Sequence, residues 1–203
     1  MAEITAITPQ KKDKSRCNIE LDGKFFCGMK LETVMKNRLK AGMSVDTEFL
    51  SRLQMESEKL TALDKALTHI TVSMKTEKEI RDYLTRKGYL SDVLDYVVEK
   101  MKGYGYLDDA VYAKSYAENA SARKGRRMIA AELKRKGVSD EQIKGALDGL
   151  TGETESAKRH FEKYMRGKTY DRPTLQKAFR HLLSKGYDYE TARAAISGAD
   201  DED

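Results

Sequence analysis

The sequence has no tryptophan and only two prolines, two cysteines and three histidines among its 203 residues. With Cys17 and Cys27 as the only thiols, a disulfide scaffold is excluded. The histidines show no metal-ligand spacing with one another or with a cysteine, so we expect no metal site. Because Pro9 and Pro173 are the only prolines, long windows remain in which helices can run uninterrupted. The scarcity of proline therefore favours a mostly helical protein.

Long hydrophobic runs are also missing. No stretch approaches the roughly 20 apolar residues that a membrane-spanning helix requires, and the N-terminus has neither the basic start nor the apolar block of a secretory signal. Charged residues make up 35% of the chain, against about 25% in an average soluble protein, and the mean hydropathy is −0.69. We expect a soluble, cytoplasmic monomer without membrane contact.

Positive charge is concentrated in the second half of the chain. The formal net charge is only +5, but residues 121–186 hold 17 Lys and Arg against 8 Asp and Glu, before the chain ends in acidic residues. A basic region of this kind favours a polyanionic partner, or a filament coated with one. The alternative interpretation is an ordinary solvated helical surface.

A 49-residue repeat is the strongest pattern in the sequence. Lys-Gly pairs end in Gly88, Gly137 and Gly186, which are 49 residues apart both times. Aligning the three segments on these glycines needs no gap and brings six apolar columns into register. The column four residues before the glycine consists of Leu84, Leu133 and Leu182. Columns four residues apart share one face of a helix, and each glycine stands where a helix C-terminus needs a left-handed residue.

Each repeat is predicted to contain three helices, and such a unit has too little core to be stable alone. Stacked units can share their apolar faces. The predicted fold is therefore mainly α, with three tandem three-helix repeats forming an elongated curved array and a small N-terminal β-hairpin and helical extension. The predicted boundaries are 1–56 for the extension, 57–105, 106–150 and 151–198 for the three repeats, and 199–203 for an acidic tail.

The N-terminal extension contains a hairpin signal. Asp22-Gly23 separates two short apolar segments and tolerates the positive φ angles of a two-residue turn. With that turn, Ile19 faces Phe26 and Cys27 falls on the face opposite Cys17, so the two cysteines should not bond within the hairpin. Because a lone hairpin is unstable in water, it must pack on the helices or on the segment around Ile4 as a third strand.

Signals for catalysis are weak. The sequence has no phosphate-binding glycine loop and no nucleophile elbow. Asp108 and Asp109 are the only conspicuous carboxylate pair, and adjacent helical residues point about 100° apart, so the two could not share one substrate atom. We interpret them as structural residues at a helix N-terminus, where a carboxylate accepts backbone N–H bonds. We predict no catalytic residues, no cofactor and no enzymatic activity.

Basic residues of the second and third repeats are the candidate binding residues. Arg123, Arg127 and Lys134 are spaced to form one stripe on the middle helix of the second repeat. The whole set predicted to contact a partner or DNA consists of Arg123, Lys124, Arg126, Arg127, Lys134, Arg135, Lys168, Arg172, Lys177 and Arg180.

The second repeat resembles the RecX family of recombinase regulators. The resemblance begins at Gly105-Tyr106-Leu107-Asp108-Asp109 and continues through Arg123-Lys124-Gly125 to Lys136-Gly137-Val138. The other two repeats match by the repeat pattern, and the segment from Ile4 to Gly28 is similar to the β-rich extension of longer family members. The resemblance spans roughly residues 4–197.

What the resemblance implies is a non-catalytic protein that binds the RecA recombinase, chiefly its filament on single-stranded DNA. Family members lie in the filament groove and inhibit ATPase, strand-exchange and coprotease activities, which places them in recombination, DNA repair and the SOS response. The alternative is a direct DNA-binding protein whose three-helix units act like helix-turn-helix modules; weak direct DNA binding is compatible with both. A scaffold for another helical protein is a third alternative.

Overall fold

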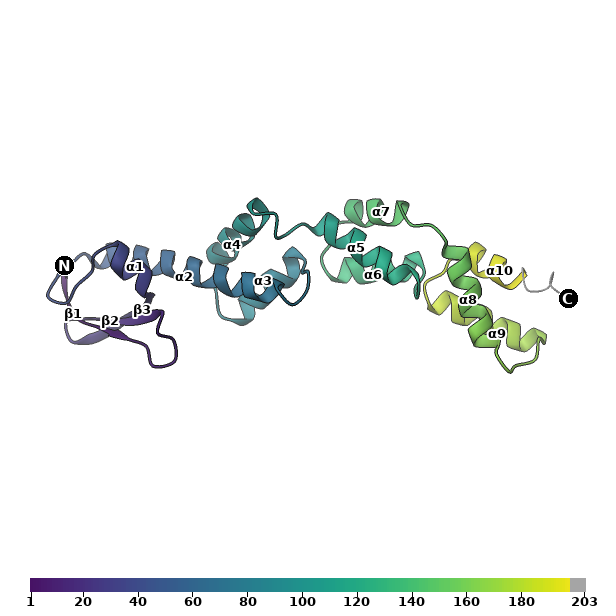
Figure 1. Ribbon diagram of the computed structural model, residues 1–203, viewed down its shortest axis with the longest axis horizontal. Helices are drawn as coiled ribbons and strands as arrows, with labels where there is room; N and C mark the ends of the chain where they lie inside the picture. The colour runs from purple at the N-terminus through teal and green to yellow at the C-terminus, as the bar shows by residue number, and fades with distance from the viewer. Residues whose placement is uncertain (198–203) are drawn as a thin grey trace. The chain divides into compact units, whose positions relative to one another are not determined.

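In the computed structural model, residues 1–197 are described, and they form a small N-terminal sheet and ten helices (Figure 1). The strands are β1 (Ala2–Pro9), β2 (Arg16–Leu21), β3 (Lys24–Lys30) and β4 (Ser44–Val45). The helices are α1 (Leu31–Lys36), α2 (Thr47–Ile70), α3 (Glu77–Arg86), α4 (Ser91–Gly103), α5 (Asp109–Ser121), α6 (Arg126–Arg135), α7 (Asp140–Asp148), α8 (Glu153–Met165), α9 (Arg172–Ser184) and α10 (Tyr189–Ser197). The acidic tail predicted for residues 199–203 lies outside the described residues.

The chain divides into two compact units. The first consists of Met1–Ser73 and Ile80–Tyr106, and the second of Met74–Glu79 together with the chain from Leu107 onward. The first therefore holds the sheet, α1, α2, α4 and most of α3. The second holds the first turn of α3 and all helices from α5. No helix of residues 1–197 is both long enough and apolar enough to cross a membrane.

An antiparallel sheet of order β3-β2-β1-β4 forms the N-terminal part of the first unit. The predicted turn is confirmed: Asp22 and Gly23 connect β2 to β3 with φ angles of 46° and 76°. β1, which contains Ile4, supplies the third strand that a lone hairpin needs, and α2 packs against β3. Both ways of supporting the hairpin are therefore used.

The predicted register of the hairpin was wrong beyond its turn. Leu21 pairs with Lys24 beside the turn, but the register shifts between Glu20 and Ile19, so that Ile19 faces Cys27 instead of Phe26. An extra residue on one strand of a β-bulge moves every later side chain to the other face. Cys27 therefore points into the same core as Cys17.

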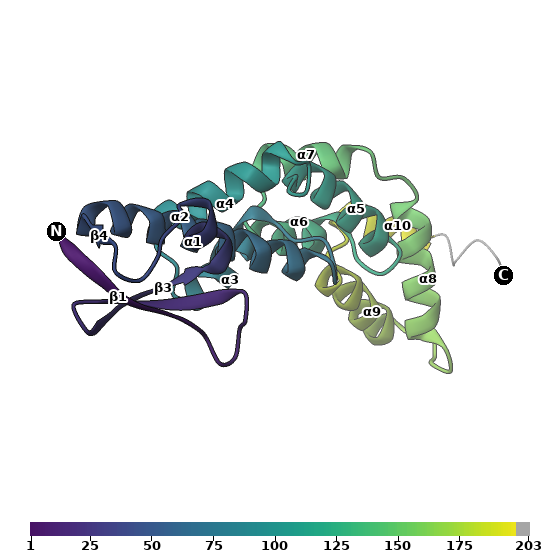
Figure 2. The same cartoon turned by 60° about the vertical axis from the view of Figure 1, so that its left-hand side comes forward.

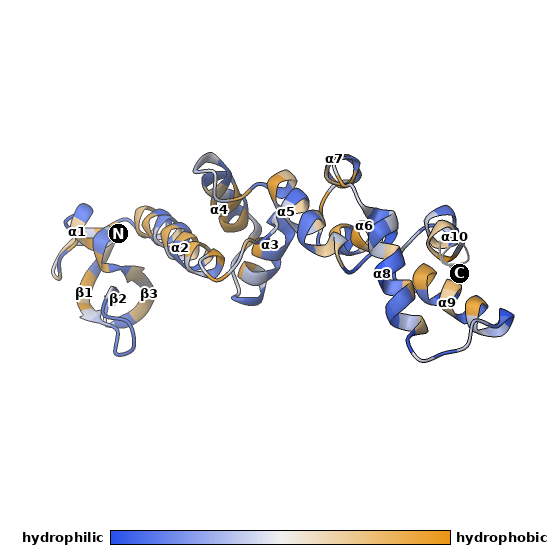
Figure 3. Ribbon diagram, turned by 45° about the vertical axis from the view of Figure 1, so that its right-hand side comes forward, coloured by the Kyte–Doolittle hydropathy of each residue, from blue (hydrophilic) through white to orange (hydrophobic). Residues whose placement is uncertain are grey.

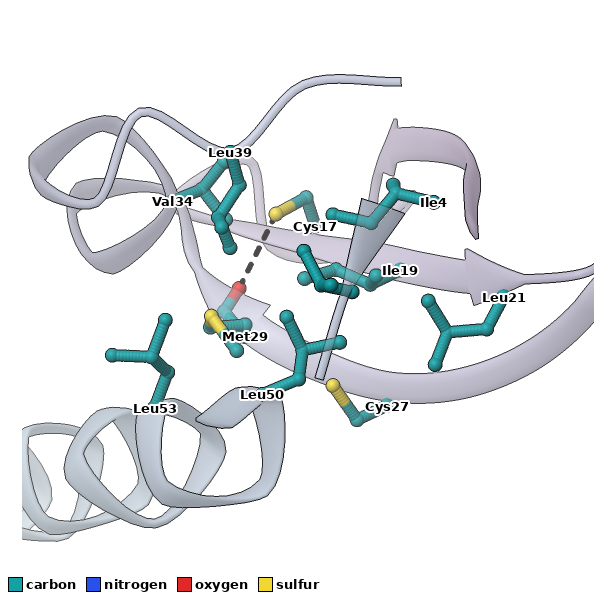
Figure 4. Close-up of a cluster of buried hydrophobic side chains, with 11 residues drawn as sticks. Ile4, Cys17, Ile19, Leu21, Cys27, Met29, Val34, Leu39, Leu50 and Leu53 are labelled. Atoms are coloured by element: carbon teal, nitrogen blue, oxygen red, sulfur yellow. Dashed lines mark hydrogen bonds between the residues drawn. The ribbon is translucent and has the colours of Figure 1, made fainter. Parts of the chain in front are cut away.

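That core lies between the sheet and the start of α2. Leu50 and Leu53 extend from α2 toward Cys17, Ile19 and Met29 on the strands (Figure 4). Both cysteines are free thiols, as expected, although they share one core. The Cys17 thiol donates a hydrogen bond to the backbone oxygen of Met29 at 3.6 Å, and burial raises the pKa of the Cys27 thiol to about 11.

The tandem three-helix pattern is confirmed. α5, α6 and α7 form one three-helix repeat and α8, α9 and α10 another, while α3 and α4 follow the long α2 (Figure 1). Leu84, Leu133 and Leu182, which form one apolar column, are completely buried. The three glycines four residues later have positive φ angles, 85° at Gly88, 88° at Gly137 and 91° at Gly186.

The core of the third repeat is repacked around one large aromatic residue. Its columns carry Ala178 and Ala192, where the second repeat has isoleucines. Tyr187, at the position of Val138 in the second repeat, is completely buried in this core. Its hydroxyl group lies 2.8 Å from the hydroxyl group of Ser156. A larger residue at one position thus compensates for smaller ones at two others, which preserves core volume.

Asp108 and Asp109 both contact the N-termini of helices. Asp108 accepts hydrogen bonds from the backbone N–H groups of Ala110 and Val111 and so caps α5. The Asp109 carboxylate accepts a bond from the backbone N–H of Glu77, in the first turn of α3. The Ser139–Gln142 capping box of α7 is complete. These contacts give Asp108 and Asp109 structural roles at helix N-termini.

Candidate partner-binding surface

One face of α9 combines positive charge with apolar surface. A hollow of about 390 Å³ lies along it. Its lining residues are spaced so that they share one helical face; they are Arg172, Leu175, Gln176, Phe179 and Arg180. The ribbon of α9 accordingly carries both orange hydrophobic and blue hydrophilic stretches in Figure 3.

The centre of this α9 face is apolar and its ends are cationic. Leu175 and Phe179 are half-buried, and the Phe179 ring packs edge-on against Tyr189, with 5.1 Å between centroids. Arg172 and Arg180 are exposed, and neither forms an ion pair within residues 1–197. Apolar and aromatic centres flanked by arginine are typical of surfaces that bind other proteins.

The basic stripe predicted on α6 is shorter than expected. α6 begins at Arg126 after the N-cap Gly125, so Arg123 lies in the preceding turn and not on the helix. Arg127 and Lys134 lie on α6 and are exposed. The Lys134 ammonium is 3.0 Å from the Asp140 carboxylate, but both side chains are well exposed, so water screens this pair.

Lys124 is held by acidic and phenolic groups of the second repeat. Its ammonium lies 2.6 Å from Glu132 Oε1, and the Tyr116 hydroxyl group donates to Glu132 Oε2 at 2.6 Å. Burial opposes ionisation of Glu132, but these hydrogen bonds outweigh it and lower the pKa of the carboxyl group. Lys124 therefore fixes the α5–α6 turn, a role for which the sequence carried no signal.

Arg126 is likewise engaged inside the second unit. Its guanidinium Nε is 2.9 Å from Glu153 Oε2, and Nη2 donates to the backbone oxygen of Leu150 at 2.6 Å. Its backbone N–H also donates to Glu153. Arg135, the last residue of α6 and another predicted contact residue, is exposed. Of the residues in the second repeat that were predicted to contact a partner, Arg123, Arg127 and Arg135 are exposed without an ion pair to any residue that the structure describes.

A glycine contact places α6 against the end of α9. The backbone N–H groups of Gly125 and Arg127 donate to the carbonyl oxygens of Lys185 and Gly186, at 3.0 and 3.1 Å. A Cβ atom on Gly125 would lie 2.3 Å from the Gly186 carbonyl carbon. The Lys185-Gly186 pair therefore ends α9 and also contacts the start of α6. The sequence predicted only the first of these roles.

The same contact occurs 49 residues earlier within the second unit. The Thr76 hydroxyl group donates to the backbone oxygen of Lys136 at 2.7 Å, as the Gly125 amide does to Lys185. A Cβ on Gly137 would collide with the Lys78 side chain at 2.6 Å. The repeat period thus carries a recurring junction, whereas a Cβ on Gly88 would meet nothing within 4 Å.

Domain models of one protein family match three successive parts of the chain. Models of three domains match: "Regulatory protein RecX N-terminal domain" over residues 2–46, "RecX, first three-helix domain" over 62–101, and "RecX, second three-helix domain" over 108–147. A regulatory protein RecX of Clostridium perfringens (strain SM101) is 33% identical, with 97% of this chain aligned to 95% of that protein. The chain belongs to the RecX family. A RecX protein of Bacillus licheniformis is 31% identical over all of this chain and 79% of its own length.

The RecX likeness extends to a solved structure. A crystal structure described as regulatory protein RecX superposes with a TM-score of 0.74 at 26% identity, covering 97% of this chain and all of that one. The second RecX three-helix domain, residues 108–147, contains α6 and the Lys124–Glu132 pair. The family is one of regulatory proteins, and the α9 face lies beyond that domain, in the third repeat.

Proposed function

We propose that this RecX-family chain regulates a RecA-type recombinase by binding its filament on single-stranded DNA. Binding in the filament groove would inhibit the ATPase, strand-exchange and coprotease activities and so modulate recombination and DNA repair. Family membership over the whole chain is the observation that carries the proposal. The protein is proposed to act by contact alone.

The contact is proposed to use the exposed cations of the second unit. Arg127 and Lys134 on α6 supply one site, and Arg172 and Arg180 on α9 another, with Leu175 and Phe179 between the two arginines. The backbone bonds at Gly125 and Gly186 support this use of both helices, because they hold α6 against the end of α9. Two contacts on one body strengthen binding through effective concentration.

The test measures ATP hydrolysis by a RecA-type recombinase on single-stranded DNA at increasing concentrations of this protein. Two charge reversals are compared: Arg127→Glu with Lys134→Glu, and Arg172→Glu with Arg180→Glu. Each should raise the concentration for half-inhibition at least about tenfold while the helical circular dichroism stays unchanged, since all four side chains are exposed.

A control variant changes charge equally elsewhere. Lys11→Glu with Lys12→Glu lies in the exposed loop between β1 and β2 and should inhibit like the unaltered chain. Unchanged inhibition by both reversed variants would contradict the proposed surface. Failure of the unaltered chain to inhibit would contradict the proposed function, and tight sequence-selective binding to naked duplex DNA would favour the DNA-binding alternative.

A further inference from the structure

A second hollow, in the third repeat, collects basic side chains. It has a volume of about 460 Å³ and opens where α8 and α9, side by side in Figure 2, approach their C-termini. Its lining residues are nitrogen bases except for one tyrosine; they are His160, Lys163, Tyr164, Arg166, Lys168, His181 and Lys185. None of these lining residues is acidic.

The cations in this histidine-lined hollow are not neutralised by the rest of the described chain. Lys163, Arg166 and Lys168 are exposed and Lys185 is half-buried, and none forms an ion pair within residues 1–197. Elsewhere in the same unit, Lys124, Arg126 and Lys136 each face a glutamate. Like charges gathered in one concavity repel one another and attract an anion, because the concave walls focus the field.

The two imidazoles stand within this field. His160 faces Lys163 and Arg159 of α8, Lys185 at the end of α9, the backbone of Arg123 and the ring of Tyr187. Burial lowers the pKa of His160, and these cations lower it further.

His181 stacks on Tyr164 at 4.8 Å and faces Lys185, Lys168 and His160. Burial and the same positive field lower its pKa too. An anion bound among these cations would favour the protonated forms of both rings.

The chemistry of the lining selects a phosphate. Arg and Lys bind phosphate oxygens through charge-assisted hydrogen bonds, and several such side chains can donate to the same phosphate group. Base stacking is less suited, because the Tyr164 ring is already covered by His181 and by the Lys168 ammonium, which lies 3.2 Å from its centroid. The exposed position of Lys163 and Arg166 leaves room for a strand that continues beyond the hollow.

We propose that this histidine-lined hollow binds phosphodiester groups of a nucleic-acid strand, with Lys163 and Lys185 as its main contacts and His160 and His181 as proton-dependent donors. The proposal does not rest on the regulation of a recombinase. Its test uses the protein alone, so either proposal can fail without the other.

The first experiment measures binding of a fluorescein-labelled thymidine oligonucleotide by anisotropy at low salt. Lys163→Gln with Lys185→Gln should weaken binding at least about tenfold and reduce the magnitude of the slope of log affinity against log salt by about 1.4, since each phosphate contact on a single strand contributes about 0.7. Lys114→Gln with Lys144→Gln, two exposed lysines on α5 and α7, should change affinity less than about twofold. Equal losses in both variants would overturn the proposal.

The second experiment follows the imidazole resonances of the unaltered full chain by NMR between pH 5 and pH 8. Because a bound phosphate favours the protonated rings, the oligonucleotide should raise the pKa of His160 and His181 and should bind more tightly as the pH falls. His160→Gln with His181→Gln should remove that pH dependence. Unmoved histidine pKa values at saturating oligonucleotide would overturn the proposal.

Pyrophosphate identifies the source of the phosphate group. Under the proposal it competes only weakly, since the strand supplies several linked phosphates. If pyrophosphate moves both histidine pKa values and the oligonucleotide does not, the hollow takes a free phosphate, which overturns the assignment to a nucleic-acid strand. If neither ligand moves them, the cations only complement the C-terminal dipoles of α8 and α9, which overturns the proposal entirely.

Discussion

Single glycines decide whether neighbouring repeats of the second unit can approach. Gly125 has a φ of −76°, which any residue can adopt, so its requirement for glycine comes only from the nearby Gly186 backbone. Gly125→Ala forces backbone atoms apart and should lower the free energy of unfolding by about 1–3 kcal/mol or more. Urea unfolding followed by circular dichroism measures the change.

Gly145 provides the matched control for this substitution. It lies within α7, and an added Cβ would meet nothing within 4 Å. Gly145→Ala should stabilise the protein by about 0.5–1 kcal/mol, because alanine loses less backbone entropy in a helix. Equal effects of the two substitutions would show that the close contact at Gly125 does not matter for stability.

Among the helices, the Glu132 network links α5 and α6 and makes stability depend on pH. Hydrogen bonds from Lys124 and Tyr116 keep the pKa of Glu132 below its ordinary value in the folded chain, despite burial. A carboxyl group with a lowered folded pKa contributes stability above its unfolded pKa of about 4.3, and this contribution is lost as the pH falls through the folded value.

Glu132→Gln should therefore reduce the free energy of unfolding by about 1 kcal/mol at pH 7, and the difference from the unaltered chain should shrink toward pH 3. Thermal unfolding across this pH range measures it. Glu56→Gln removes the same charge from an exposed residue in the middle of α2 and should change the free energy of unfolding by less than about 0.5 kcal/mol. A Glu132→Gln deficit that stays constant from pH 7 to pH 3 would contradict this account.

Elements whose signals are local could be predicted from the sequence, and elements that depend on distant contacts could not. The Asp22-Gly23 turn and the Asp108 cap each depend on residues a few positions apart. The register shift between Ile19 and Glu20 could not be predicted, because a β-bulge adds one residue to a strand without requiring a particular residue type. The faces of β3 were therefore assigned wrongly.

The same distinction applies to the candidate surfaces. The basic positions are visible in the sequence, but their acidic partners are not, since Glu153 reaches Arg126 from another repeat. Arg172 and Arg180 were predicted from their charge alone, and the structure places both on one face of α9 with Leu175 and Phe179. Their contact with a partner stays a prediction. The histidine-lined hollow could not be predicted from the sequence, because His160 and His181 lie on separate helices. Only the packing of α8 against α9 brings the two side chains together.

At the scale of the whole molecule, the 49-residue period was predictable because the same residue types recur at equivalent positions of successive repeats. One interval of 49 residues relates the buried leucines, the left-handed glycines and the hydrogen bonds that the backbone oxygens of Lys136 and Lys185 accept. A chain that duplicates one module duplicates its contacts with the next. The boundaries assigned to the individual repeats remain predictions.

The charge of the whole molecule makes its proposed action sensitive to salt. If exposed arginines contact the phosphates or acidic groups of a recombinase filament, affinity should fall steeply between about 50 and 200 mM salt. Arg172→Gln with Arg180→Gln should show a shallower dependence, because fewer counterions are released on binding. Anisotropy of labelled protein with preformed filament measures both slopes.

Lys11→Gln with Lys12→Gln removes the same charge from the loop between β1 and β2 and should keep the slope of the unaltered chain. This control separates local contact from long-range attraction, since the loss of two charges lowers the net charge from +5 equally in both variants. If both variants show the same reduced slope, the α9 arginines act only through net charge. That result would remove α9 from the proposed contact and leave the α6 cations to carry it.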